Sequence, residues 1–113
     1  MTVSGRLVIV SGQVGWNPER GEFASDDIAT QTGQALRNIV AVLASGGAEP
    51  RHLVRLTWYV VDRQEYVAAR AAIGTAYRKV IGSHFPAMSL VIVAGLLEER
   101  ARVEIEATAV VPR

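Results

Sequence analysis

The sequence FPAMSLVIVAGLLEERARVEIEATAVV, residues 85–111, contains the two patterns that decide the fold. Residues 88–94 carry apolar side chains on both faces of an extended chain, which predicts a central strand of a sheet. Residues 102–111 alternate strictly, and their polar face includes Glu104 and Glu106. One of these strands is apolar on both faces, and the other carries carboxylates on one face. The two faces of the sheet must therefore be covered by two different kinds of surface.

Residues 6–14 (RLVIVSGQV) predict a first strand with apolar side chains on both faces. We expect Val8 and Val10 on the face that the helices leave open. Gly12 lies near the end of this strand, where glycine lets the backbone bulge and leaves its amide open to a ligand. A strand-end glycine without a function is the alternative interpretation.

The first helix is predicted to follow residue 25. Ser25 and Asp26 are candidate N-caps, and Asp27 is a favourable anion for the first turn. Residues at helical spacing then form one stripe toward the core: Ile28, Thr32, Ala35, Leu36, Ile39 and Leu43. Four polar residues off the centre of this stripe are expected to face solvent or a partner: Gln31, Gln34, Arg37 and Asn38.

Residues 53–62 (LVRLTWYVVD) predict a second long strand, with Trp58 on its large apolar face and Tyr59 on the other face. Asp62 and Glu65 resemble the capping box of a second helix. The buried side of that helix is predicted to contain Tyr66, Ala69, Ile73, Tyr77 and Val80.

The element order β-α-β-α-β-β predicts one α+β domain over residues 1–113, a two-layer structure with a mixed sheet and two helices on one face. The other face is predicted to be apolar as well, because it would carry Val8, Val10, Tyr59, Val91 and Val93. Each such side chain left in water would forgo roughly 1.5–3 kcal/mol. We therefore expect a homo-oligomer whose copies cover one another's open faces.

Charge and composition exclude several classes of function. The chain has 12 basic and 11 acidic residues and a net charge of +1, so we expect neither nucleic-acid nor membrane binding. With two histidines and no cysteine, neither a metal site nor thiolate chemistry is expected. Serine–histidine catalysis has no supporting motif. No leader or bilayer-spanning apolar run is visible, which predicts a cytoplasmic protein.

Four stretches, in this order and spacing, resemble the Rid family of reactive intermediate deaminases, formerly called YjgF: SGQVGWNPERGE (11–22), QTGQALRNIVAVLASGGA (31–48), LVRLTWYVVDRQEY (53–66), and FPAMS (85–89) followed by VEIEATAV (103–110). The resemblance implies a chorismate-mutase-like fold and a homotrimer with pockets in the clefts between subunits. It also implies hydrolysis of short-lived enamines and imines such as 2-aminoacrylate, giving a 2-keto acid and ammonia without a cofactor.

Carried over residue by residue, the resemblance implies a site with one major change. Deaminase members bind the substrate carboxylate with an arginine, and Met88 holds that position here. A thioether cannot make a charge-assisted pair. Glu104 matches the glutamate that orients water or relays a proton, and Gly12 and Leu90 match positions that offer backbone amides to the substrate. An asparagine of the second helix falls at Arg70.

Several of these residues have alternative interpretations. Arg70 and His84 are candidates to replace the missing cation. Alternatively, Arg70 is an ordinary exposed helix arginine and His84 is a loop histidine without a role. Tyr59 is either a cleft residue or an interface anchor. Glu104 and Glu106 share a strand face, an arrangement seen in glycosidases and, more often, in solvated strand edges. We expect Glu104 to act and Glu106 to be structural.

Two functions follow from the sequence. The first is an imine or enamine deaminase with an altered small-molecule substrate, because Met88 makes an anion pocket implausible. The second is a non-catalytic trimer that binds a small metabolite or a partner protein through the same clefts.

Overall fold

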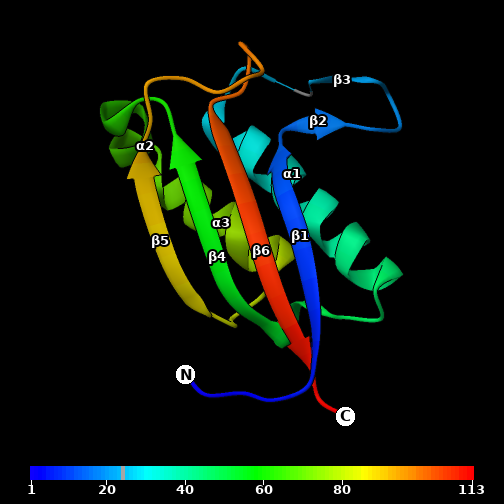
Figure 1. The fold of residues 1–113 in the computed structure, drawn as a ribbon. Helices are drawn as coiled ribbons and strands as arrows, with labels where there is room; N and C mark the ends of the chain where they lie inside the picture. Colours follow the sequence, from blue (N-terminus) through cyan, green and yellow to red (C-terminus); the bar gives the residue numbers. More distant parts are fainter. Residues whose placement is uncertain (24) are drawn as a thin grey trace.

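The computed structural model describes residues 1–23 and 25–113, and its centre is a four-stranded sheet in the order β1-β6-β4-β5 (Figure 1). β4 and β5 are parallel, whereas β6 is antiparallel to both β1 and β4. The predicted mixed sheet of an α+β domain is therefore confirmed. The strands are β1 (Arg6–Val14), β4 (Leu53–Val60), β5 (Ala87–Ile92) and β6 (Val103–Val111), with a small separate pair, β2 (Trp16–Asn17) and β3 (Glu22–Phe23).

The helices cover one face of the sheet, with α1 and α3 lying behind the strands in Figure 1. The second predicted helix is divided at Ala69 into two. The helices are α1 (Ile28–Ser45), α2 (Arg63–Ala68) and α3 (Arg70–Val80), and a 3-10 turn, η1 (Pro50–His52), precedes β4. Among the described residues, no helix has the length and apolar character needed to cross a membrane.

Aspartates begin both major helical segments. Asp27, rather than the predicted Ser25 or Asp26, caps α1, and its carboxylate accepts a hydrogen bond from the Thr30 N–H at 2.9 Å. Asp62 caps α2 as predicted and accepts from the Glu65 N–H at 3.1 Å.

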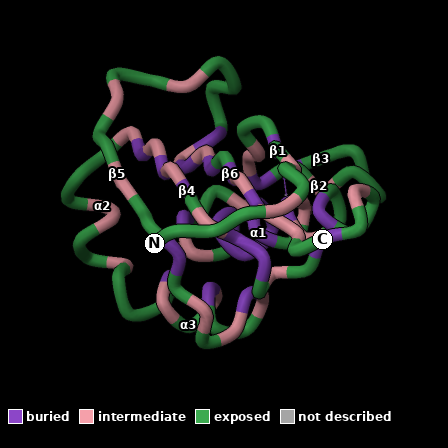
Figure 2. Tube along the Cα trace, turned by 60° about the horizontal axis from the view of Figure 1, so that its bottom comes forward, coloured by how far each residue is buried: buried purple, intermediate pink, exposed green. Residues whose placement is uncertain are grey.

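The core lies between the sheet and helices α1 and α3, where the buried positions gather in Figure 2. The alternation predicted for β6 is confirmed, because Val103, Ile105, Ala107 and Ala109 are all buried. The largest fully buried apolar side chains come from α1, the two central strands and β1: Leu36, Ile39, Leu43, Leu53, Leu56, Val60, Val103, Ile105 and Val10.

The prediction that residues 88–94 form a central strand was wrong, because β5 lies at the edge of the sheet. Met88 is 39% exposed and Val91 is 42% exposed. On one face of β5, Met88 lines a cavity with residues of α3, and on the other face Val91 is exposed. The central strands are β4 and β6.

The assignment of the two faces of β1 was also wrong. Val10 is buried and Val8 packs against the core, whereas Leu7 and Ile9 lie on the open face. The register decides this, because Val10 pairs with the buried Ala107. Both faces of β1 are apolar, so the pattern alone cannot choose between them.

Candidate functional site

Glu104 lies on the open face of the sheet, next to an irregular point in β1. The pairing of β1 with β6 jumps between Val10 and Gln13, so that Ser11 and Gly12 have no register partner. Such a bulge redirects the backbone and commonly lies beside functional residues. The half-buried Glu104 side chain packs over Gly12, where an added Cβ would lie 2.5 Å from Glu104 Oε2. The absence of a side chain at position 12 therefore makes room for the carboxylate.

Tyr59 is the register partner of Glu104 on the adjacent strand β4. Its hydroxyl donates a 2.7 Å hydrogen bond to Glu106 Oε1. This bond raises the pKa of Tyr59, as do partial burial and the negative charges of Glu106 and Glu104, while Arg55 lowers it. Glu106 is thus held by a phenol, and Glu104 has no such partner among the described residues.

Met88 and Leu90 point toward the opposite face of the sheet. Their register partners on β4 are the buried Leu56 and Trp58, which belong to the core under the helices. Met88 lines a small cavity of about 160 Å³ between β5 and α3. Its lining residues are Trp58, Tyr66, Arg70, Ile73, Gly74, Tyr77, Arg78, Phe85 and Met88. Arg70 therefore lies at the same cavity as Met88.

The predicted site residues form two groups within one chain. Gly12, Tyr59 and Glu104 belong to the open face, whereas Met88, Leu90 and Arg70 belong to the helix side. Because neighbouring positions of a strand alternate between faces, Glu104 and Met88 cannot meet across the sheet. One copy of the chain does not bring the two groups together.

His84 has a structural role. Its Nε2 lies 2.8 Å from the carbonyl oxygen of Leu53, and its own carbonyl oxygen accepts a 2.6 Å hydrogen bond from the Tyr77 hydroxyl. Burial raises the pKa of Tyr77 to about 12. These bonds join the loop before β5 to α3 and β4. Of the two candidates to replace the missing cation, Arg70 is better placed, because it lies at the cavity beside Met88.

A larger groove that the sequence did not predict adjoins Gly12. Its volume is about 550 Å³, and its lining residues are Gly12, Gln13, Val14, Trp16, Pro18, Asn38, Ala41, Val42 and Glu98. The Asn38 amide donates to the carbonyl oxygens of Val14 and Trp16, at 3.2 and 2.8 Å. The sequence held one indication of this groove: Asn38 lies in the middle of a helix, where asparagine is unfavourable. An asparagine at such a position suggests that its side chain makes a specific hydrogen bond.

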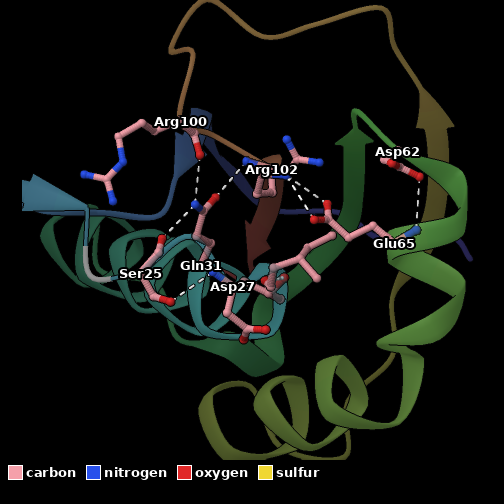
Figure 3. Close-up of polar contacts among 9 residues, drawn as sticks. Ser25, Asp27, Gln31, Asp62, Glu65, Arg100 and Arg102 are labelled. Carbon is pink, nitrogen blue, oxygen red and sulfur yellow. Dashed lines mark hydrogen bonds and ion pairs between the residues drawn. The ribbon is translucent and has the colours of Figure 1, made fainter.

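The chain segment before β6 is fixed to α1 by a buried amide (Figure 3). Gln31 is 0% exposed; its Nε2 donates to the carbonyl oxygens of Ser25 and Arg100, and its Oε1 accepts from the Arg102 N–H at 2.7 Å. Gln34 is also buried. The prediction that Gln31 and Gln34 face solvent or a partner was therefore wrong, because both are buried within the chain. Of the other two residues in that prediction, Arg37 is exposed and Asn38 is half-buried.

Arg102 adds an ion pair on the same segment. Its Nε lies 2.9 and 3.1 Å from the two carboxylate oxygens of Glu65 in α2 (Figure 3). Both side chains are about one-third exposed, so this pair is better shielded than a surface salt bridge. Gln31 and Glu65 together hold the start of the strand that carries Glu104. Among residues 1–23 and 25–113, no cluster of three His, Cys, Asp or Glu residues is placed to bind a metal.

The chain is similar to proteins of known family along most of its length. The family model described as Endoribonuclease L-PSP matches residues 1–111. A 2-iminobutanoate/2-iminopropanoate deaminase from Escherichia coli is 35% identical over 94% of this chain and 80% of its own length. The human protein of the same name is 30% identical over 93% of this chain and 73% of its own length.

Solved structures share the fold. A Rid-family protein of unknown function from Yersinia pestis superposes with a TM-score of 0.85 at 37% identity, covering 98% of this chain and 83% of its own. The YjgF gene product from E. coli gives a TM-score of 0.82 at 33% identity, with coverages of 96% and 84%.

Proposed function

The chain belongs to the endoribonuclease L-PSP family, the family of the Rid and YjgF proteins, and from this premise we propose that it hydrolyses a small imine or enamine to a carbonyl compound and ammonia. The names of its relatives from E. coli and human support this reaction class. The observation that carries the proposal is the packing of the Glu104 carboxylate over Gly12, at the bulge that interrupts the pairing of β1 with β6.

Glu104 has the chemistry that imine hydrolysis requires. An imine carbon is attacked by water, and the addition is faster when a base takes the water proton. The Glu104 carboxylate takes the proton from the attacking water and gives it to the imine nitrogen, which yields a carbinolamine. It then takes the proton of the carbinolamine hydroxyl and gives it to the amine as the C–N bond breaks, so that a carbonyl compound and ammonia leave. The backbone amides of the Ser11–Gly12 bulge are the nearest groups for orienting the substrate, and the step needs no cofactor.

The proposed site is a cleft between two copies of the chain in a homotrimer. One copy provides Glu104, Gly12 and Tyr59, and its neighbour provides the cavity beside Met88 with Leu90 and Arg70. The opposite placement of these groups on the sheet supports this arrangement. So do the apolar residues at the edges of the open face, because Leu7 is 58% exposed, Ile9 69% and Val91 42%.

The substrate is proposed to differ from 2-aminoacrylate. Met88 offers no charge, and its cavity is lined largely by aromatic and aliphatic side chains. Met88 gives a substrate carboxylate no charge-assisted hydrogen-bonded partner from β5, and such a pair contributes roughly 1.5–3 kcal/mol. The imine is therefore expected to carry a larger apolar group than an alanine-derived one.

Ribonuclease activity, which the family description names, has less support from this chain. The net charge is only +1, and three arginines are paired with Glu49, Asp26 and Glu65. Binding to a phosphate backbone requires a continuous basic surface.

A non-catalytic role in binding a small metabolite or a partner protein is the second candidate. The aromatic cavity beside Met88 favours it, because this cavity is formed within one chain and lies apart from Glu104. Ammonia release from imines generated in the assay by an amino-acid oxidase separates the two functions. Turnover that Glu104→Gln removes, with assembly unchanged, supports the enzyme. Binding of metabolites without turnover of any imine in the panel supports the binding role.

A further inference from the structure

Two unpaired guanidinium groups lie at the cavity beside Met88. Arg70 and Arg78 both line it, and both are exposed residues of α3. Among the described residues, neither forms an ion pair or a side-chain hydrogen bond, whereas Arg51, Arg100 and Arg102 each pair with a carboxylate. Two like charges at one cavity repel each other, and a bound anion would remove that cost.

Gly74 gives this pair its geometry. Arg70, Gly74 and Arg78 follow one another at intervals of four residues, which places them on one face of the helix. A Cβ at Gly74 would lie 3.2 Å from Arg78 Nη1 and 3.9 Å from its Cζ. The Arg78 guanidinium thus folds back over Gly74, in the direction of Arg70. A side chain at position 74 would compete for the space that the Arg78 guanidinium occupies.

The remaining walls of the cavity are apolar and aromatic. Phe85 stacks on Tyr77 with a centroid distance of 5.2 Å and an interplanar angle of 17°, yet it remains 61% exposed. Met88 provides an uncharged, adaptable wall on the other side. The cavity of about 160 Å³ is smaller than the roughly 300–1,000 Å³ of drug-sized sites, which limits the ligand to a small molecule.

We propose that Arg70 and Arg78 form an anion-binding pair that takes the carboxylate of a small acid with an apolar side chain. The pair would provide from α3 the charge that Met88 cannot provide from β5. The ligand's carboxylate would lie between the guanidinium groups, and its hydrocarbon part against Phe85 and Met88. The identification of this acid with the imine substrate rests on the proposed function. The binding of carboxylates by the arginine pair is independent of that function.

The test uses 3-phenylpropanoate and its neutral analogue 3-phenylpropanamide, two probes of the same shape that differ in charge. Binding to the full chain is measured by isothermal titration calorimetry at low and high salt. The carboxylate is expected to bind more tightly than the amide, and more weakly as salt rises. Arg70→Gln and Arg78→Gln should each weaken carboxylate binding about 10-fold or more, with little effect on the amide. Lys79→Gln, the control, removes an equal charge from the next position of α3 and should change neither affinity.

Two further variants keep the outcomes distinct. Gly74→Leu retains both arginines and should weaken carboxylate binding, because a large side chain would occupy the space over which the Arg78 guanidinium folds. Glu104→Gln should retain binding while it abolishes hydrolysis. Equal affinity for the two probes, or unchanged affinity in the Arg70→Gln/Arg78→Gln double variant, overturns the proposal. Loss of assembly in that double variant without a change in affinity assigns the arginines to an interface and also overturns it. Absence of imine hydrolysis with intact carboxylate binding contradicts only the proposed function.

Discussion

The Glu104 carboxylate fills the space above Gly12, and a methyl group at position 12 would lie 2.5 Å from Oε2 and 2.7 Å from Cδ of Glu104. Gly12→Ala should therefore displace the carboxylate while the fold persists. We expect imine hydrolysis to fall about 10- to 100-fold, because general-base catalysis depends on the position of the base. Ammonia release checks this, with circular dichroism as the test of folding.

Gly95→Ala is the control for that variant, because nothing lies within 4 Å of the added Cβ. It should keep the activity of the unmodified chain. A Gly12→Ala protein with full activity would show that the position of Glu104 is irrelevant to the reaction.

The two glutamates of β6 should differ in their effect on turnover. Glu104→Gln should lower kcat by about 100-fold or more, the loss expected when a general base is removed. Glu106→Gln should reduce it only slightly, and it should lower the pKa of Tyr59, because the hydrogen bond to Glu106 is the main reason why that pKa is raised. Steady-state kinetics and a spectroscopic phenol titration test both effects. Equal losses in the two variants would refute the assignment of roles.

Assembly should depend on the apolar edge of the open face. Ile9→Glu places a charge where Ile9 is now 69% exposed, so the single chain should fold normally while copies associate more weakly. Sedimentation velocity measures the association. Leu97→Glu is the control, because Leu97 is 97% exposed in the loop before β6 and should not alter assembly. If Ile9→Glu assembles like the unmodified chain, the interface lies elsewhere.

The buried amide of Gln31 should contribute more to stability than an ordinary glutamine. Gln31→Leu leaves the Arg102 N–H and the carbonyl groups of Ser25 and Arg100 without their partner. We expect the free energy of unfolding to fall by about 2–4 kcal/mol. Urea denaturation measures it, and the exposed Gln64→Leu should stay within about 0.5 kcal/mol of the unmodified chain. Similar free energies of unfolding for the two variants would mean that the hydrogen bonds of Gln31 do not contribute to stability.

Stability should decrease at alkaline pH because of Tyr77. Its pKa is raised from 10.0 in the unfolded chain to about 12 in the folded chain, so the folded state keeps the phenol proton over this interval. The corresponding stability is complete below pH 10 and is lost as pH rises toward 12. Thermal denaturation of the unmodified chain and Tyr77→Phe should therefore show a smaller decline with pH in the variant. Parallel declines would contradict this.

Patterns set by side-chain periodicity could be predicted from the sequence. The alternation of β6 and the apolar stripe of α1 each have one buried face, so their orientation is determined locally. β1 and β5 are apolar on both faces, and only pairing partners show that Val10 is buried and that β5 is an edge strand. Gln31 escaped prediction because its partners Arg100 and Arg102 lie 69 and 71 residues away in the chain.

The sequence proposed residue types for the candidate site, but it could not predict on which face of the sheet each residue lies. Glu104, Gly12 and Met88 were identified from motifs, but a motif does not state on which side of a sheet each position lies. Arg78 matched no motif, and the sequence pattern alone did not show that its guanidinium lies over Gly74.

If the proposed cleft brings the two sides of the sheet together from neighbouring copies, catalytic capacity is shared between copies. A copy separated from its neighbours by dilution would carry half of two different reaction centres and a complete one of neither. Conversely, a mixture of one variant lacking Glu104 and another lacking Arg70 would regain some intact centres wherever unlike copies meet in the right order. Competence in such a protein is a property of neighbours and not of single molecules.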